Sequence, residues 1–172
     1  IEGDITNYEL ILNISKDCKY IVHLAASTGV DISIENPRFD LNTNVLGTFN
    51  LLESSRINKI KKIIMASSGA VIGETTPPIK ETNLPKPISP YGASKLSSEA
   101  YANAYSSAYG IQSIVLRFSN VYGPGSNLKK SVISKFIKDF ILFGENEIFG
   151  DGNQTRDFIY ISDLISAIEK SI

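Results

Sequence analysis

The sequence has 172 residues, 42% of them hydrophobic and 20% charged, which is typical of a globular protein with one domain, or one domain and part of another. Its formal net charge of −1 gives no electrostatic footprint for nucleic acid or for an anionic membrane. Cys18 is the only cysteine, so no internal disulfide and no metal site are expected, and its side chain is predicted to be buried or half-buried.

No apolar run approaches the roughly 20 residues that span a bilayer, and no signal-peptide pattern is present, so a cytoplasmic protein is expected. The first residues, IEGDI, are typical of the end of a strand. The last, DLISAIEKSI, stop within a helical pattern. Because residue 1 is also Ile rather than Met, we expect the chain to be a piece of a longer protein.

Three apolar runs without polar alternation predict buried strands of a parallel sheet. They are YIVHLAA (20–26), KKIIMASS (61–68) and QSIVLRFSN (112–120). Helical patterns precede and separate them at 7–17, 42–57 and 92–110, and the last of these ends on Gly110, a suitable C-cap. Strands and helices that alternate in this way predict a doubly wound α/β sheet.

Two further regions differ from this pattern. The segment 75–90 holds five of the seven prolines and is predicted to be a long, lid-like loop, which inside a compact domain is usually functional. After Gly125 the sequence predicts a helix over 126–144, a short strand over 146–150, a loop, a strand over 158–162 and a last helix that begins at Asp163.

Small and polar residues follow each of the three predicted strands, where ligands bind in open parallel sheets. They are Ala25, Ala26 and Ser27, then Ser67, Ser68 and Gly69, then Ser119 and Asn120. Small side chains there let a flat cofactor approach the backbone. Any one of these sites could be simple loop filler, but three in a row favour a cofactor cleft.

The stretch SPYGASK (89–95) places Tyr91 four residues before Lys95. With 8 Tyr and 13 Lys, chance alone predicts roughly 0.6 pairs at this spacing, so the pair carries weight only through its surroundings. Those surroundings are GDI, HLAA, NVLGT, SSGAVIG, LRFSNVYGPG and FGDGNQTRDFIYISDL, all in one order. The sequence therefore resembles the extended short-chain dehydrogenases, in particular the NAD-dependent epimerase/dehydratase family and its UDP-glucose 4-epimerase members.

The resemblance covers essentially the whole chain and implies a domain organisation. Residues 1–125 would be the C-terminal part of an NAD-binding Rossmann domain, and 126–172 the start of a smaller nucleotide-sugar-binding region interleaved with it. The Gly-rich phosphate loop of the fold would lie before residue 1. We therefore expect the 172-residue chain alone to bind NAD weakly or not at all and to be inactive.

The resemblance also implies three catalytic residues. Tyr91 would be the acid/base and Lys95 its partner, since helical positions four apart have Cβ atoms about 5–6 Å apart. A nearby positive charge lowers the pKa of a phenol, which is otherwise about 10. Ser68 would hydrogen-bond the reacting sugar hydroxyl, with Ser67 as the weaker alternative.

For the cofactor NAD, the resemblance implies contacts to the adenine, the cleft and the nicotinamide. Besides Tyr91 and Lys95, the residues concerned are Asp4, Ile5, Leu24, Ala25, Ala26, Asn44, Phe118 and Ser119. The alternative for Asn44 is a polar helix residue satisfied locally. His23, the only histidine, is expected to be structural.

For a UDP-sugar, the resemblance implies Asn120, Phe149 and Arg156 in addition to Ser68. Arg156 would hold the diphosphate, because guanidinium presents a rigid fork of donors to phosphate oxygens. Its alternative is a surface salt bridge with Asp157. Phe149 would pack on the uracil, and its alternative is a core position.

The residues after Ser68 bear on the reaction. Family dehydratases carry an acid there for elimination, whereas this sequence has Gly69, Ala70 and Val71, which favours C4 epimerisation of a UDP-hexose. Ile72 departs from the family's usual Tyr. The alternatives are a related nucleotide-sugar dehydratase or reductase, and a non-catalytic nucleotide-binding relative, which would usually lack the Tyr or the Lys.

A homodimer is implied for the full-length protein, through helices that include 92–110. The spacing of Tyr101, Tyr105 and Ala108 fits a face packed against a second copy. A face packed into the protein's own core fits it equally well.

Overall fold

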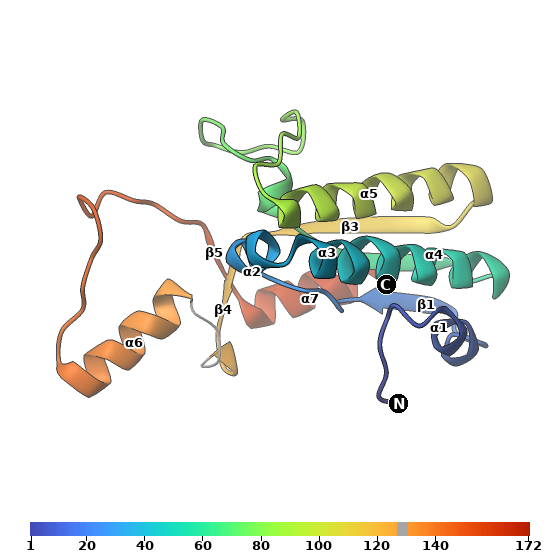
Figure 1. Cartoon of the computed structure of the whole chain (residues 1–172), viewed down its shortest axis with the longest axis horizontal. Helices are drawn as coiled ribbons and strands as arrows, with labels where there is room; N and C mark the ends of the chain where they lie inside the picture. Colours follow the sequence, from blue (N-terminus) through green and yellow to red (C-terminus); the bar gives the residue numbers. More distant parts are fainter. Residues whose placement is uncertain (127–130) are drawn as a thin grey trace. The chain divides into compact units, whose positions relative to one another are not determined.

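The computed structural model describes residues 1–126 and 131–172 (Figure 1). The chain divides into two compact units. The first comprises 1–117 and 171–172, and the second comprises 118–170. The boundary expected after residue 125 lies within the second unit.

A three-stranded sheet of order β1-β2-β3 forms the centre of the first unit. β1 and β2 are parallel, with Tyr20 opposite Lys62 and His23 opposite Met65. The predicted α/β fold with a parallel sheet is therefore confirmed. The strands are β1 (Tyr20–His23), β2 (Lys62–Ser68) and β3 (Gln112–Phe118).

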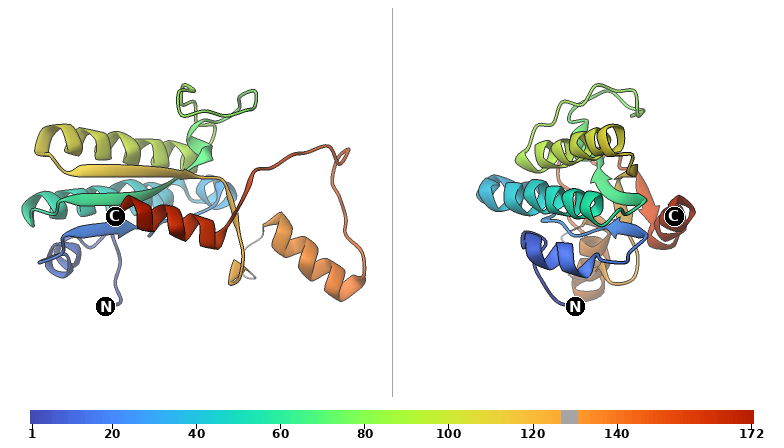
Figure 2. Two further views of the ribbon diagram at one scale, coloured as in Figure 1. Left: turned by 180° about the vertical axis from the view of Figure 1, so that it is seen from behind. Right: turned by 90° about the vertical axis from the view of Figure 1, so that its right-hand side faces the viewer.

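The helices of the first unit begin and end at residues that suit these positions. Ser89 accepts a hydrogen bond from the backbone of Gly92 at 3.1 Å at the start of α5, and Gly110 ends it at a φ of 72°. α4 and α5 lie on the same face of the sheet (Figure 2). The helices are α1 (Tyr8–Ile14), α2 (Val30–Glu35), α3 (Pro37–Asp40), η1 (Leu41–Leu46), α4 (Gly47–Ile57), η2 (Gly69–Val71) and α5 (Pro90–Tyr109).

The apolar core of the first unit lies between the sheet and the helices α4 and α5. Tyr105 belongs to it and is 8% exposed, which favours the core interpretation of this part of α5, whereas Tyr101 is 43% exposed. The cluster comprises Leu52, Ile63, Met65, Ala102, Tyr105 and Ile111.

The second unit is built around a two-stranded parallel ladder. β4 (Asn120–Tyr122) pairs with β5 (Phe158–Tyr160). Its helices are α6 (Val132–Phe143) and α7 (Ile161–Ser171). The helix predicted over 126–144 is confirmed for 132–143, and residues 127–130 of that prediction lie outside the described residues.

One predicted strand is confirmed in part and another is wrong. The strand expected over 112–120 breaks at Ser119, whose hydroxyl donates to the carbonyl of Asp157 at 2.9 Å, so the chain leaves the first sheet and joins the second. No strand forms over 146–150. The carbonyl of Phe149 there accepts a hydrogen bond from the side chain of Gln154 at 3.1 Å instead of from a neighbouring strand.

Other differences are local. The helix predicted over 42–57 opens with a π-helical turn, η1, before α4 begins. α2 and α3 were not predicted, because six and four residues are too few to show a helical period. Cys18 is exposed, not buried, since it lies in the polar turn between α1 and β1.

His23 is buried at the end of β1, as expected of a structural histidine. Its Nε2 lies 3.0 Å from the Thr48 hydroxyl, which itself donates to the carbonyl of Asn44 at 2.6 Å. Because the Thr48 proton is already used, Nε2 must be the donor to Thr48. Burial, with a smaller effect of Lys95, lowers the pKa of His23 to about 4.

This histidine should make the fold sensitive to acid. The unfolded chain binds a proton near pH 6.5 and the folded chain only near 4, so stability rises with pH across that window. We expect about 3 kcal/mol of unfolding free energy to be lost between pH 6.5 and 4. Urea unfolding of the wild type and a His23→Gln variant at several pH values tests this: the variant should lack this part of the pH dependence, and parallel curves would contradict it.

Candidate active site

Tyr91 and Lys95 share one face of α5, one turn apart. Lys95 is 7% exposed, its Nζ donates to the carbonyl of Ala66 at 3.1 Å, and it lies 5.9 Å from the centre of the Tyr91 ring. Ala66 belongs to β2, so the lysine is held against the strand that precedes Ser68. The structure thus brings all three predicted catalytic residues to one place.

The first turn of α5 lies very close to the turn that follows Ser68. A Cβ added to Gly92 would meet the carbonyl oxygen of Ala70 at 2.5 Å, a distance that side chains do not tolerate. Gly92 therefore permits the approach that sets Tyr91 beside Ser68. The proline-rich segment before it contains no helix or strand, and Lys86 donates from its backbone to the carbonyl of Ile72 at 3.2 Å.

The two adjacent serines have different partners. The hydroxyl of Ser67 donates to Glu99, which is also bound by Arg117 at 2.7 Å. Ser67 is 5% exposed and is therefore committed to a buried contact. Ser68 is half-buried, accepts from the backbone of Ala70 at 3.1 Å, and hydrogen-bonds Tyr91. This geometry favours Ser68 over Ser67 as the serine that works with Tyr91.

Burial dominates the electrostatics of the pair. It raises the pKa of Tyr91 and lowers the pKa of Lys95, since both charged forms lose solvation. The hydrogen bond from Ser68 works against the first shift and lowers the pKa of Tyr91. The negative charge of Asp40 raises the pKa of both groups.

Asn44 is fully engaged in the interior. It is 1% exposed, and its side chain both accepts from the backbone of Ser27 at 2.9 Å and donates to the Ser27 carbonyl at 3.0 Å. The same amide donates to Asp40 at 2.8 Å and to Ser94 at 3.2 Å. Asn44 therefore fixes the loop after β1 against α5, and of its partners only Asp40 is local in the sequence.

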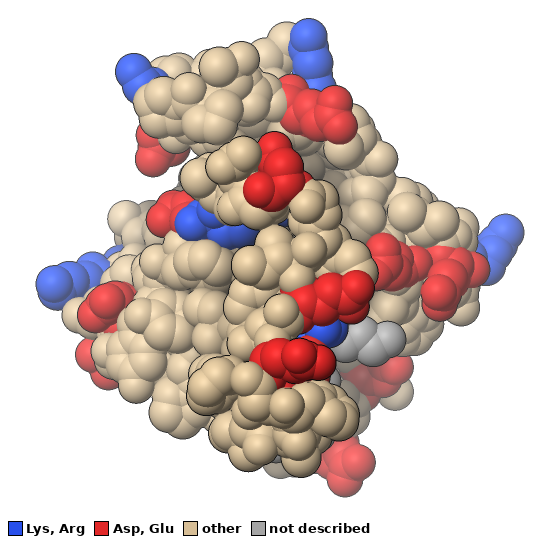
Figure 3. Space-filling model, turned by 90° about the vertical axis from the view of Figure 1, so that its left-hand side faces the viewer, with Lys and Arg blue, Asp and Glu red and all other residues tan. Residues whose placement is uncertain are grey.

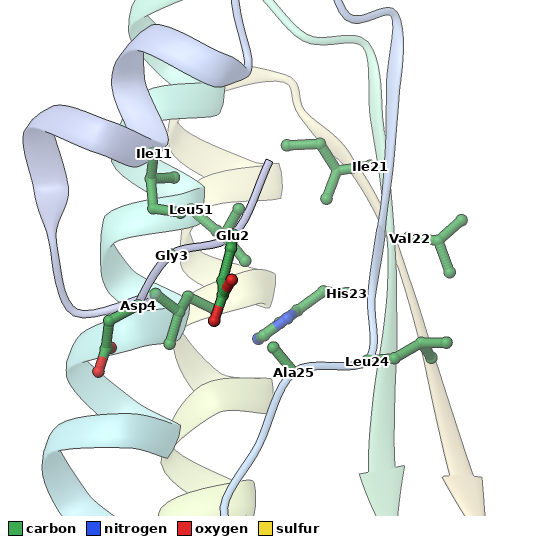
Figure 4. Close-up of a pocket in the computed structure, with 11 residues that line it drawn as sticks. Glu2, Gly3, Asp4, Ile11, Ile21, Val22, His23, Leu24, Ala25 and Leu51 are labelled. Atoms are coloured by element: carbon green, nitrogen blue, oxygen red, sulfur yellow. The ribbon is translucent and has the colours of Figure 1, made fainter.

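Four of the residues predicted to bind the cofactor line one open pocket of about 540 Å³ in the first unit. They are Asp4, Ile5, Leu24 and Ala25. Figure 4 shows that the His23 ring points into the space between the chain segments, whereas Val22 and Leu24 point to the other side of β1. Ala26 follows directly along the chain.

Asp4 and Ile5 are held by neighbours in different ways. The Oδ1 of Asp4 accepts from both the backbone and the hydroxyl of Thr6 at 2.8 Å, and these bonds lower the pKa of the carboxyl. A Cβ added to Gly47 would lie 2.6 Å from the Ile5 side chain. Gly47 thus lets Ile5 pack directly on the start of α4.

Of the four residues predicted to bind a nucleotide-sugar, all but Ser68 lie in the second unit. Phe149 and Arg156 line a pocket of about 660 Å³, and Asn120 and Arg156 line a smaller one of about 220 Å³. Phe149 is 68% exposed, which excludes the core alternative. Arg156 donates to the carbonyl of Thr155 at 2.8 Å, and no ion pair to Asp157 occurs among the described residues.

Phe118 and Ser119 open the second unit at the junction of β3 and β4. Asn120 uses its side-chain amide to bond the Asp157 carbonyl at 3.1 Å, beside the Ser119 contact to the same oxygen. Ser119 and Asn120 therefore join β4 to β5. Each unit carries its own share of the predicted site residues.

Two acidic residues near the catalytic pair, the buried Asp40 and the half-buried Glu99, were not predicted from the sequence. Glu99 links Ser67 to Arg117, and Asp40 is 1% exposed and bonded to Asn44. Asp40 lies four residues before Asn44, a helical spacing that could have indicated the contact. Nothing in the local sequence distinguishes Glu99 from a solvent-exposed helix residue.

The surface offers no strong electrostatic feature on the face drawn in Figure 3, where acidic and basic side chains are interspersed among uncharged ones. This agrees with the net charge of −1. Within 1–126 and 131–172, no helix has both the length and the apolar character needed to cross a bilayer.

The sequence matches known proteins along its whole length. The profile of the NAD dependent epimerase/dehydratase family matches residues 1–172. A Methanocaldococcus jannaschii protein, provisionally named a UDP-glucose 4-epimerase, is 45% identical over 172 residues, which covers 97% of this chain and 56% of that protein.

Two solved structures are similar to this chain. The UDP-glucose 4-epimerase of Thermotoga maritima with UDP-glucose has a TM-score of 0.94 and 36% identity, and covers 100% of this chain and 58% of its own. The UDP-glucuronic acid 4-epimerase of Bacillus cereus, in complex with UDP-glucuronic acid and NAD, has a TM-score of 0.90 and 34% identity, and covers 99% and 54%. The chain thus spans about half the length of the relatives it matches.

Proposed function

The chain belongs to the NAD-dependent epimerase/dehydratase family, and from that premise we propose that the intact protein inverts C4 of a UDP-hexose with the help of bound NAD. One observation carries this proposal. Ser68, Tyr91 and Lys95 converge at the end of β2 and the start of α5, and the turn after Ser68 bears no carboxylate.

The missing carboxylate separates epimerisation from elimination. Removal of water from a sugar needs a further acid near the reacting carbons. η2 consists of Gly69, Ala70 and Val71, and Val71 is fully buried. Of the acidic residues around the pair, Asp40 is buried and bonded to Asn44, and Glu99 is paired with Arg117.

The residues of this chain account for the proton transfers. Tyr91, as phenolate, takes the proton of the sugar 4-hydroxyl and later returns it, while Ser68 hydrogen-bonds the same oxygen. Lys95 favours the phenolate through its charge. The chemistry that NAD supplies when bound is acceptance of the C4 hydride and its return to the opposite face of the 4-keto sugar.

The residues present fit the cofactor. The pocket after β1 is lined by an acidic residue, Asp4, suited to a hydrogen-bond donor, and by the apolar side chains of Ile5 and Ile21, suited to a flat ring. Among the described residues, the Lys95 ammonium donates one hydrogen bond, to Ala66, of the three that it can donate. Its other donors are suited to the hydroxyls of a ribose.

The second unit supports a UDP-sugar as substrate. Its larger pocket combines an exposed aromatic ring, Phe149, with the guanidinium of Arg156. An aromatic face suits a uracil base, and guanidinium suits a diphosphate. The two epimerase crystal structures named above contain UDP-glucose and UDP-glucuronic acid, respectively.

The proposal is tested on the intact protein that contains this chain. Incubation with UDP-glucose and, separately, with UDP-glucuronic acid should give the C4 epimer of one of them, which proton NMR identifies. The absorbance of NADH should show no net change. Release of water, or steady consumption of NADH, would instead assign a dehydratase or reductase. A protein that binds both compounds without turning over either would be the non-catalytic alternative.

A further inference from the structure

Asp40 is a buried carboxylate to which the proposed mechanism gives no role. It ends α3, is 1% exposed, and accepts at Oδ1 from the Asn44 amide at 2.8 Å. Within the part of the chain that is described, its Oδ2 has no hydrogen-bond partner. A buried ionised carboxylate is costly unless an opposite charge lies near it.

The groups that face Asp40 lie mainly on α5, which packs against both α3 and η1. They are Tyr91 and Lys95, whose ionisation responds to the Asp40 charge, together with the neutral Ser94. His23 lies behind Lys95 and is uncharged at neutral pH. The remaining charged residues of α2 and α3, which are Asp31, Glu35 and Arg38, are exposed to solvent.

Asp40 is linked to the pair by contacts as well as by charge. The Asn44 amide that bonds Asp40 also bonds Ser94, whose hydroxyl donates to the carbonyl of Tyr91 at 2.9 Å. The chain of contacts therefore runs from Asp40 through two side chains to the backbone of the proposed acid/base. No water-exposed group interrupts it, since Asp40, Asn44 and Ser94 are all buried.

We infer that Asp40 is a positioning residue for the Tyr91–Lys95 pair: its buried carboxylate holds Asn44 in place and is the internal counter-charge of the Lys95 ammonium. The inference rests on the proposed function, because it concerns the same site. It assigns to Asp40 no contact with substrate or cofactor.

Removing the Asp40 charge should change the pH dependence of turnover in a particular way. Activity rises as Tyr91 ionises and falls as Lys95 loses its proton. The carboxylate disfavours the first event and also disfavours the second. Without the carboxylate, Tyr91 ionises and Lys95 loses its proton at lower pH. The acid limb and the alkaline limb of the profile therefore both move to lower pH.

The experiment compares Asp40→Asn with the wild type in the intact protein. Asn keeps the size of Asp and an acceptor oxygen for Asn44, and removes only the charge. The ratio of variant to wild-type kcat should rise towards the acid limb and fall towards the alkaline limb, by roughly tenfold from end to end. Asp31→Asn, on exposed α2, is the matched control and should leave the profile in place. A lower profile with unmoved limbs would overturn the inference.

A second readout separates this inference from the proposed function. The phenolate absorbance of Tyr91 is isolated by subtracting the titration of Tyr91→Phe from that of each protein. Tyr91 should ionise at lower pH in Asp40→Asn whether or not the protein is an epimerase. If the wild type turns over no UDP-sugar but this shift is found, the proposed function fails and the inference stands.

If Asp40→Asn is too unstable for kinetics, a variant of Lys95 provides a further test. Lys95→Met leaves the carboxylate without its counter-charge, so Asp40→Asn should cost less thermal stability in that background than in the wild type. Equal costs, or failure of both Asp40→Asn proteins to fold, would assign Asp40 a structural role alone and overturn the inference.

Discussion

Replacing Tyr91 by Phe is expected to lower kcat of the intact protein by about 10³-fold and to leave KM for the UDP-sugar within a factor of about two. In the proposed mechanism the phenol oxygen takes the sugar proton, whereas the residues proposed to bind the UDP part of the substrate lie in the second unit. Steady-state kinetics on the UDP-sugar that serves as substrate gives both constants.

Tyr101→Phe is the matched control for this change. It removes the same oxygen from the same helix, but from a side chain that is 43% exposed and lies against the Phe49 ring. Its kcat should stay at the wild-type value. If Tyr91→Phe retained wild-type turnover, the assignment of the acid/base would be refuted, and equal losses in both variants would point to damage to α5 instead.

Arg156→Ala is expected to raise KM for the UDP-sugar by about 10- to 100-fold, with a smaller change in kcat. Arg156 lines both pockets of the second unit, and a diphosphate would lose charge-assisted hydrogen bonds in the variant. Arg156→Lys should recover part of the affinity, because it restores the charge without the fork of donors. Initial rates over a range of substrate concentrations measure these effects.

The control for Arg156 is Arg56→Ala. Arg56 is an exposed arginine of α4 that pairs with Glu53 at 2.5 Å, remote in sequence from the second unit. Its replacement should leave KM unchanged. An unchanged KM in Arg156→Ala would remove the basis for a diphosphate site there, and would leave Arg156 as a residue that only bonds Thr155.

Much of the fold follows from local patterns. Apolar runs gave β1, β2 and β3 because a strand covered on both faces has no reason to alternate. α5 was predictable from the helical pattern over 92–110 and from the glycine at its end. The break at Ser119 was not, because it depends on Asp157, a residue far along the chain that supplies the bonding carbonyl.

The candidate site was also predictable from the sequence only in part. Asp4, Ile5, Leu24 and Ala25 could be grouped from the sequence because they follow motifs of the family, and they line one pocket. The roles of Asp40 and Asn44 could not, since burial and the orientation of an amide are properties of packed helices. A predicted strand over 146–150 failed for a related reason: five residues with strand-like composition form no strand without a neighbour.

The contact of Ser67 with Glu99 has a consequence for how related sequences are interpreted. Moving β2 by one residue along its axis would exchange the faces of Ser67 and Ser68, and nothing in the two identical side chains opposes that exchange. A slip that brought Ser67 to the place of Ser68 would bring Ala66 to the place of Ser67, so Glu99 would remain paired with Arg117 but lose its serine. In a homologue with the same Ser-Ser pair, the serine that faces the tyrosine therefore has to be identified from the positions that correspond to Glu99 on α5 and Arg117 on β3. These two positions are eighteen residues apart in this chain.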